Sequence, residues 1–130
     1  MTTPASDKTP PRLHDLEAAV MEEMWRVDEA PVRAVMEALN ARADKERKYT
    51  TIMTIMARLY RKGLLTRRRE SKTDIYAAAM TREEYQEARA REEVGALIEQ
   101  YGDLALVQFT RQMHGLDSKR REQLRRLAGK

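Results

Sequence analysis

In residues 49–63, YTTIMTIMARLYRKG, polar and apolar side chains alternate at the spacing of a helix. At about 100° per residue, threonines and arginines gather on one face of a helix, and isoleucine, methionine and leucine on the other. The polar face consists of Thr50, Thr51, Thr54, Arg58 and Arg61. Threonine hydrogen-bonds phosphate oxygens and contacts thymine methyl groups, and arginine binds guanine or phosphate through a bidentate fork. This face suits a helix in the DNA major groove; the alternative is a solvated basic face.

Apolar periodicity also predicts the elements that must position this face. It indicates a first helix over residues 15–27 and, after a break at residues 28–31, a second helix that begins at Val32. A polar connection, residues 42–48, leads into the third helix. We expect that helix to end at Gly63, in the left-handed conformation of a C-cap.

Two short runs after the third helix, LLTRRRE and TDIYAA, are typical of strands and are separated by Ser71 and Lys72. They predict a β-hairpin. Three helices followed by a hairpin is the order of a winged helix-turn-helix domain, in which the third helix is the recognition helix. The fold class predicted is therefore mainly α, with a small β-hairpin wing and a C-terminal helical dimerisation region.

The charge of the chain is concentrated where this fold would meet DNA. Seven basic residues and one acidic residue lie between Arg58 and Lys72, whereas six glutamates and three arginines lie between Thr81 and Glu99. A local basic patch is the footprint expected for an anionic partner. The wing residues predicted to contact DNA, with plain solvation as the alternative, are Arg67, Arg68, Arg69 and Lys72.

The chain after Met80 predicts three further helices, over residues 82–100, 103–113 and 118–128. Apolar side chains surround the middle one, and such a helix must be covered on several faces. We expect a second copy of the chain to cover it; the alternative is that the tail folds back onto its own winged domain. The predicted dimerisation residues are Val94, Leu97, Ile98, Tyr101, Leu104, Leu106, Val107, Phe109 and Met113. A two-fold dimer would place two recognition helices about 34 to 36 Å apart, or a multiple of that, and would require a palindromic operator.

Composition bounds the remaining classes of function. The 130 residues fit one domain with an appendage, predicted as a disordered lead-in at 1–12, a winged domain at 13–80 and a dimerisation region at 81–130. The absence of cysteine excludes disulfides, thiol catalysis and Cys-ligated zinc. No apolar run approaches the roughly 18 residues of a membrane span, so a soluble, cytoplasmic protein is expected.

Catalytic and metal-binding motifs are absent from the sequence, so we predict no enzyme, no metal and no cofactor. The two histidines, His14 and His114, are isolated. A C-terminal basic run is expected to be a solvated helix face; it comprises Lys119, Arg120, Arg121, Arg125 and Arg126. Two alternatives to an operator-binding repressor stay open: a winged helix used for protein contacts, and a repressor that binds a small molecule directly.

From Leu13 onward the chain resembles the penicillinase-repressor family of bacterial transcription repressors, the BlaI/MecI type. The matching words are LHDLEAAVMEEMW, PVRAVMEALN, YTTIMTIMARLYRKGLL and TREEY, in that order. The resemblance implies a homodimeric winged-helix repressor that binds double-stranded DNA with a TACA/TGTA-like dyad. It also implies control of a resistance or cell-wall stress gene.

The resemblance further implies roles for particular residues. The family's recognition contacts fall on Thr50, Thr51, Thr54 and Arg58. In the β-lactam-responsive branch a membrane sensor-protease system leads to cleavage in the middle tail helix, and the matching bond here is Gln108-Phe109. Cleavage there would expose the dimer interface and weaken operator binding.

Overall fold

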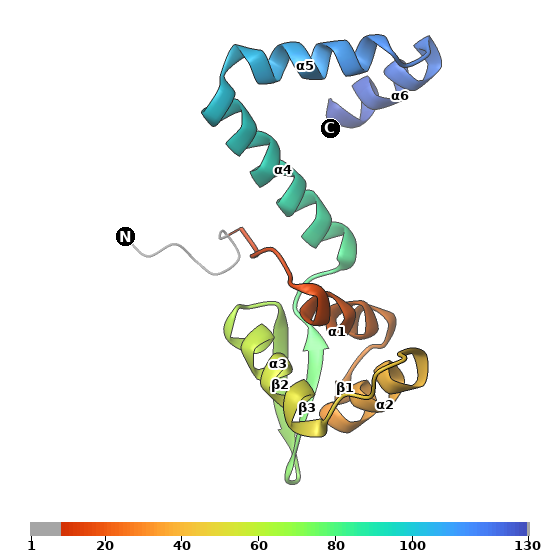
Figure 1. Cartoon of the computed structure of the whole chain (residues 1–130), viewed down its shortest axis with the longest axis vertical. Coiled ribbons are helices and arrows are strands. Elements are labelled where there is room, and N and C mark those ends of the chain that lie inside the picture. Colours follow the sequence, from red (N-terminus) through yellow and green to blue (C-terminus); the bar gives the residue numbers. More distant parts are fainter. Residues whose placement is uncertain (1–8, 130) are drawn as a thin grey trace. The chain divides into compact units, whose positions relative to one another are not determined.

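The described part of the first compact unit, which extends to Ala90, contains three complete helices, the beginning of a fourth and a small antiparallel sheet. The computed structural model describes residues 9–129. The elements of this unit that precede residue 80 are α1 (Asp15–Arg26), β1 (Ala30–Pro31), α2 (Val32–Arg42), α3 (Tyr49–Arg61), β2 (Leu65–Glu70) and β3 (Thr73–Ala78) (Figure 1). This order and the hairpin confirm the predicted winged helix-turn-helix.

The sheet has the strand order β1-β3-β2, and its hairpin is the wing. Across the hairpin, Arg67 is paired with Tyr76. The tip residue Ser71 has a φ of 57°, so a non-glycine residue takes the left-handed conformation in this tight turn. The sequence reasoning missed β1, where Ala30 pairs with Tyr76. A strand of two residues is too short to produce a periodic signal.

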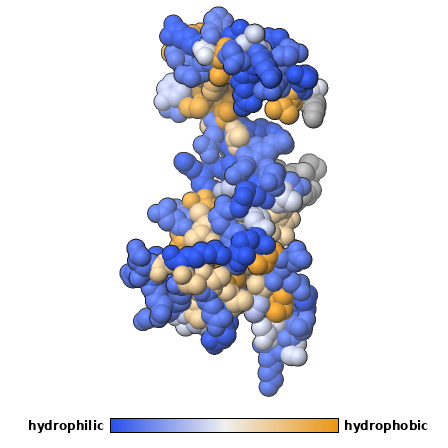
Figure 2. Space-filling view, turned by 90° about the vertical axis from the view of Figure 1, so that its right-hand side faces the viewer, coloured by the Kyte–Doolittle hydropathy of each residue, from blue (hydrophilic) through white to orange (hydrophobic). Residues whose placement is uncertain are grey.

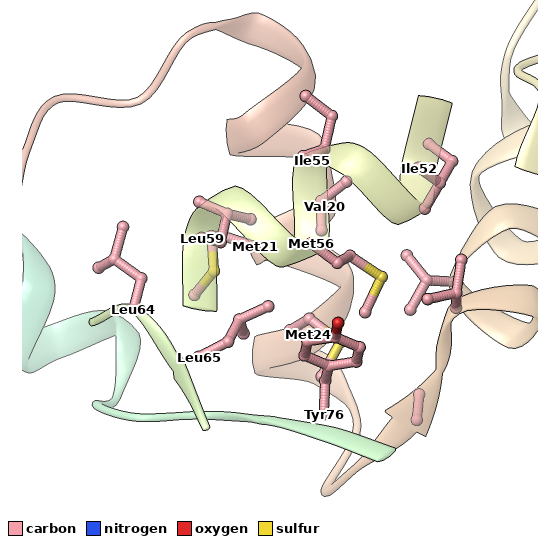
Figure 3. Close-up of a cluster of buried hydrophobic side chains, with 13 residues drawn as sticks. Val20, Met21, Met24, Ile52, Ile55, Met56, Leu59, Leu64, Leu65 and Tyr76 are labelled. Atoms are coloured by element: carbon pink, nitrogen blue, oxygen red, sulfur yellow. The ribbon is translucent and has the colours of Figure 1, made fainter. Parts of the chain in front are cut away.

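The hydrophobic core lies where α1, α2, α3 and the sheet meet (Figure 3). The apolar face of α3 is buried as predicted. Its four core residues are Ile52, Ile55, Met56 and Leu59. They meet Val20, Met21 and Met24 of α1, and Tyr76 of β3 lies below them in the view. Burying this face leaves the threonine and arginine face of α3 toward solvent.

The C-terminus of α3 carries the left-handed glycine that the sequence predicted. Gly63 has a φ of 83°. Its backbone N–H donates to the Tyr60 carbonyl at 3.0 Å, and the Leu64 N–H donates to the Leu59 carbonyl at 2.9 Å. This pair of bonds is the Schellman motif, which satisfies two carbonyls at the helix end. It turns the chain directly from the recognition helix into the wing.

Three helices follow the wing, at the positions that the sequence predicted. They are α4 (Arg82–Tyr101), α5 (Asp103–His114) and α6 (Ser118–Ala128). The second compact unit runs from Arg91 to Lys130, so α4 begins in the first unit and ends in the second. Among the described residues, none of the helices combines the length and the apolar character that a membrane crossing requires.

The predicted lead-in over residues 1–12 is described only from Thr9 onward, and residues 1–8 lie outside the described residues. Pro10 is buried. The carbonyl of Pro11 accepts a hydrogen bond from the Tyr85 hydroxyl at 3.0 Å. The described end of this segment therefore packs against the first turns of α4.

Candidate nucleic-acid interface

The polar face of α3 is exposed along its length. Its members are Thr50, Thr51, Thr54, Arg58 and Arg61. None of the thirteen residues of α3 is acidic, so no carboxylate of its own neutralises this face. Small hydroxyl side chains near the start and long cationic ones near the end give a helix that can approach a duplex closely and reach its phosphates. The structure brings together the α3 residues that the sequence singled out, and their contacts to DNA stay predictions.

A buried carboxylate from α1 holds the C-terminal end of α3. The side chain of Glu17 is 1% exposed, and its Oε2 accepts a hydrogen bond from the Lys62 Nζ at 2.8 Å. Its Oε1 accepts from the backbone N–H of His14 at 3.0 Å, which is one half of a capping box at the start of α1. The Nη1 of Arg58 lies 3.9 Å from the same Oε2. Glu17 therefore ties the start of α1 to the basic end of the recognition helix.

The charge state of Glu17 follows from opposing effects. Burial raises the pKa of its carboxyl, but the hydrogen bonds from Lys62 and from the His14 amide, with the positive charge of Lys62, outweigh it. The pKa of Glu17 therefore lies below its ordinary value, and the group is ionised at neutral pH. Sequence reasoning missed this role, although the signal was present. Glu17 lies four residues after Leu13 and three before Val20, on the apolar face of its helix.

The wing is held beside α3 by Arg67. Its guanidinium lies over the ring of Tyr60, 4.1 Å from the ring centroid. A hydrogen bond with the Tyr76 side chain raises the pKa of Arg67. A cation over an aromatic face is attracted by the ring quadrupole. Because Tyr60 is the neighbour of Arg61 on α3, this contact places the wing next to the exposed basic face.

The other wing cations differ in their surroundings. Arg68 pairs with Glu29 at 2.7 Å and with Glu70 at 2.6 Å, and these hydrogen bonds raise the pKa of Arg68 and lower that of Glu29. Arg69 pairs with Asp74 at 3.1 Å. Lys72 lies exposed at the tip of the hairpin. Carboxylates of the protein itself thus compete with phosphate for Arg68 and Arg69, and the DNA-contact role of the wing stays a prediction.

The connection between α2 and α3 is shaped by a side chain that the sequence did not single out. The Oδ1 of Asn40 accepts from the Arg47 N–H at 2.8 Å, and its Nδ2 donates to the Arg47 carbonyl at 3.1 Å. This two-way clamp fixes the residues that lead into α3. At the start of α3, the guanidinium of Arg33 lies 5.4 Å from the centroid of the Tyr49 ring. Arg33 and Tyr49 are both exposed, so a second cationic group lies at the N-terminal end of the recognition helix.

The second unit exposes apolar side chains that a single chain leaves uncovered (Figure 2, upper part). The predicted dimerisation residues with the largest exposure are Leu104, at 68%, and Tyr101, at 52%. Val94, Leu97, Leu106 and Val107 are also exposed, and Ile98, Phe109 and Met113 are half-buried. An apolar groove of about 300 Å³ is lined by Leu97, Tyr101, Leu104, Ala105, Gln108 and Phe109. The groove thus contains both residues of the bond predicted to be cleaved.

Comparison with known proteins agrees with this geometry. A family model described as the penicillinase repressor matches residues 13–130. The chain is 45% identical over 74 residues to the protein named Transcriptional regulator BlaI in two strains of Mycobacterium tuberculosis, CDC 1551 / Oshkosh and ATCC 25618 / H37Rv. That alignment covers 56% of this chain and 52% of each relative, so the chain spans about half the length of the curated relatives it matches. Among solved structures, the solution structure of the DNA-binding domain of the repressor BlaI aligns with a TM-score of 0.51 and 26% identity, over 60% of this chain and 92% of that chain.

Proposed function

The chain belongs to the penicillinase repressor family, and from this premise we propose that it is a homodimeric transcriptional repressor. Each protomer would bind one half of a palindromic operator, with α3 in the major groove and the wing along the phosphate backbone. The operator expected is double-stranded DNA with a TACA/TGTA-like dyad. The partners proposed are this DNA, a second copy of the chain, and a membrane sensor-protease system that relieves repression. The regulated gene would serve antibiotic resistance or the response to cell-wall stress.

The observation that carries the proposal is the exposed, carboxylate-free face of α3 beside a basic wing. A helix exposed only to water gains from mixed charges at i, i+4, and this helix has none. The arrangement instead matches the needs of a duplex, since hydroxyls allow close approach and arginines at the far end supply bidentate donors. The Tyr60–Arg67 contact supports a shared positive surface of α3 and wing.

Relief of repression would follow from cleavage of the Gln108-Phe109 bond in α5. The cut would separate Phe109, Met113 and all of α6 from the rest of the chain. Because residues predicted for the dimer interface lie on both sides of this bond, the cut would divide the proposed interface. Two tethered half-site contacts bind 10²- to 10⁴-fold better than either alone, so the loss of dimers is sufficient to release the operator.

The test is the salt dependence of binding to a duplex with the dyad and to a scrambled duplex of the same composition. Fluorescence anisotropy with the full chain should give a log–log slope of about −0.9 per neutralised phosphate, and several contacts per protomer make that line steep. The Arg58→Ala substitution should weaken the binding free energy for the dyad duplex by about 1 to 3 kcal/mol and that for the scrambled duplex by far less. The reason is that a base contact is lost rather than a phosphate contact.

The matched control is Arg126→Ala, which removes the same charge from an exposed position of α6. It should leave both affinities close to those of the unchanged chain. A flat salt dependence would contradict the DNA-binding proposal. Equal losses for Arg58→Ala on the two duplexes would contradict a base-reading role for Arg58.

A further inference from the structure

Arg58 shares a buried carboxylate with Lys62. Both cations approach the same oxygen, Oε2 of Glu17, whose side chain is 1% exposed. The Lys62 Nζ lies 2.8 Å from this oxygen and donates a hydrogen bond to it, whereas the Arg58 Nη1 lies 3.9 Å away, beyond hydrogen-bond distance. The other oxygen of Glu17 accepts from the His14 N–H. Each oxygen of the carboxylate therefore has a donor without Arg58.

The end of α3 places Lys62 beside Arg58. The backbone N–H of Lys62 donates to the Arg58 carbonyl at 2.9 Å, so the two residues lie one helical turn apart on the same side of α3. Gly63, with a φ of 83°, then turns the chain out of the helix. The side chain of Lys62 is 30% exposed and that of Arg58 is 44% exposed. Lys62 is thus the more enclosed cation, and Arg58 keeps more of its side chain at the surface.

Two arginines of the wing show the opposite arrangement. Arg68 donates directly to Glu29 at 2.7 Å, and Arg69 donates directly to Asp74 at 3.1 Å. A guanidinium held in this way has fewer N–H groups left for a base edge or a phosphate. Arg58 also has a carboxylate within 4 Å, but at 3.9 Å it makes no hydrogen bond to it. The difference between these arginines is that a lysine already occupies the carboxylate beside Arg58.

We propose that Lys62 keeps Arg58 available for base reading by occupying the buried carboxylate of Glu17. Without Lys62, the Oε2 of Glu17 would be buried with no donor, and an unpaired buried charge is strongly destabilising. Among the described residues, Arg58 is the other side chain that forms an ion pair with this oxygen. Arg58 would move to the oxygen and make the hydrogen bond that Lys62 makes now. Its guanidinium fork would then be bound to the protein rather than to guanine.

Lys62 is therefore a positioning residue, which affects specificity through Glu17 and Arg58 and contacts no base itself. The inference rests on the proposed function, because it needs Arg58 to read a base. The quantity that tests it is discrimination, the ratio of the affinity for the dyad duplex to the affinity for the scrambled duplex. Loss of the Arg58 side chain itself should lower this ratio by about 5- to 150-fold, the range for one bidentate base contact.

The experiment is a double-mutant cycle in the full chain, read out by fluorescence anisotropy on both duplexes. Lys62→Met keeps the apolar stem and removes the ammonium group, and discrimination should fall by at least about 5-fold. The double variant Glu17→Gln, Lys62→Met also removes the competing charge and should restore discrimination to within about 2-fold of the unchanged chain. Lys62→Arg supplies another cation and should keep it. Titrations at about pH 8 keep the ring of His14, whose charge also acts on Glu17, neutral.

Further variants separate this role from general charge and from folding. Lys45→Met is the matched control, because it removes a lysine charge from an exposed position before α3. It should leave discrimination unchanged, whatever its effect on the two affinities together. Circular dichroism and urea unfolding report whether Lys62→Met is folded under the assay conditions. If it is unfolded, Lys62→Gln replaces it: the amide donates to Glu17 without a charge, so the fold is kept and discrimination should still fall as Arg58 supplies the cation.

The outcomes are distinguishable. If the unchanged chain binds neither duplex, or binds both equally, the proposed function fails. If the unchanged chain discriminates and the folded Lys62 variant keeps the same ratio, the inference is overturned while the proposed function stands. A double variant that remains as poor as Lys62→Met would also overturn it, because Lys62 would then act on DNA directly. Unchanged discrimination in Arg58→Ala would do the same, because Arg58 would then read no base.

Discussion

At the scale of single residues, the C-terminal end of the recognition helix is held by a buried carboxylate. Glu17 is buried between α1 and α3 and binds Lys62. A buried charge is stabilising only while its partners remain in place. Because the side chain of Lys62 is 30% exposed, water screens part of the attraction, and the interaction is weaker than that of a fully buried pair.

We expect Glu17→Gln to lower the free energy of unfolding by about 1 to 2 kcal/mol at neutral pH, because a hydrogen bond to a charged group contributes about 1.5 to 3 kcal/mol and water screens part of this one. The pKa of Glu17 is lowered in the folded state, so its contribution is present above the unfolded pKa and is lost as the pH falls through the folded one. The difference between variant and unchanged chain should therefore shrink below about pH 4.

Urea unfolding at neutral and at acidic pH measures this difference. The exposed Glu37, on α2, provides the control Glu37→Gln, for which we expect little change at either pH. If Glu17→Gln lowers the free energy of unfolding as much in acid as at neutral pH, the charge of Glu17 is not what stabilises the fold.

The pairing of Arg68 leads to a second prediction at this scale. Glu29 holds one side of its guanidinium and Glu70 the other. Glu29→Gln removes a negative charge beside the wing and frees one side of Arg68 for phosphate. We expect tighter binding to specific and random duplexes alike, with a salt slope steeper by about 1, as for one added phosphate contact.

Anisotropy titrations at several salt concentrations provide the measurement. Glu83→Gln, an equal charge change at an exposed position of α4, is the control and should leave the slope as it was. If the salt slope of Glu29→Gln is unaltered, Arg68 does not contact phosphate and serves only to stabilise the wing.

At the scale of elements, the junction between α3 and the wing depends on one backbone conformation. Gly63 adopts a φ of 83°, and a Cβ added there would meet no atom within 4 Å. The cost of a side chain is therefore backbone strain alone, about 1 to 2 kcal/mol for a left-handed residue other than glycine.

Gly63→Ala should lower the free energy of unfolding by about that amount. Gly95, inside α4, has equally open surroundings and no positive φ. Gly95→Ala should instead raise stability by about 0.5 to 1 kcal/mol, because alanine is the better helix former. Chemical denaturation of both variants tests the pair, and losses of similar size in both would contradict the conformational argument.

At the scale of the whole molecule, the exposed apolar groove of the second unit calls for a partner. Leu104, Tyr101 and their apolar neighbours are exposed together on one short segment. Monomeric proteins rarely expose such a cluster of large apolar side chains to water. A second copy of the chain is the partner that the proposed function requires, since a palindromic operator binds a two-fold dimer.

Truncation after Gln108 should convert dimers into monomers, because it removes Phe109 and Met113 of the proposed interface, together with all of α6. Sedimentation measures this change directly, and operator affinity should fall by about 10²- to 10⁴-fold while half-site affinity is kept. Leu104→Asp in the full chain is the companion variant, since it places a charge in the groove without shortening the helices. Persistence of dimers in both variants would place the interface elsewhere.

The sequence alone determined the elements of this protein. Helix periodicity located α1, α2, α3 and the three tail helices, and it separated the threonine and arginine face of α3 from its apolar face. Two short runs typical of strands located the wing. These features depend on residues within one or two turns of each other, so a single stretch of chain contains all the information they need.

Only the tertiary structure decided which of these elements hold each other. Lys62 meets Glu17 across 45 positions, Arg68 meets Glu29 across 39, and Tyr85 meets Pro11 across 74. Such pairings leave no periodic trace, because periodicity relates residues within a few turns of each other; it places Glu17 on the apolar face of its helix but does not identify Lys62 as its partner. The charge that remains available for DNA on the wing depends on such contacts, and they form only when folding brings distant segments together.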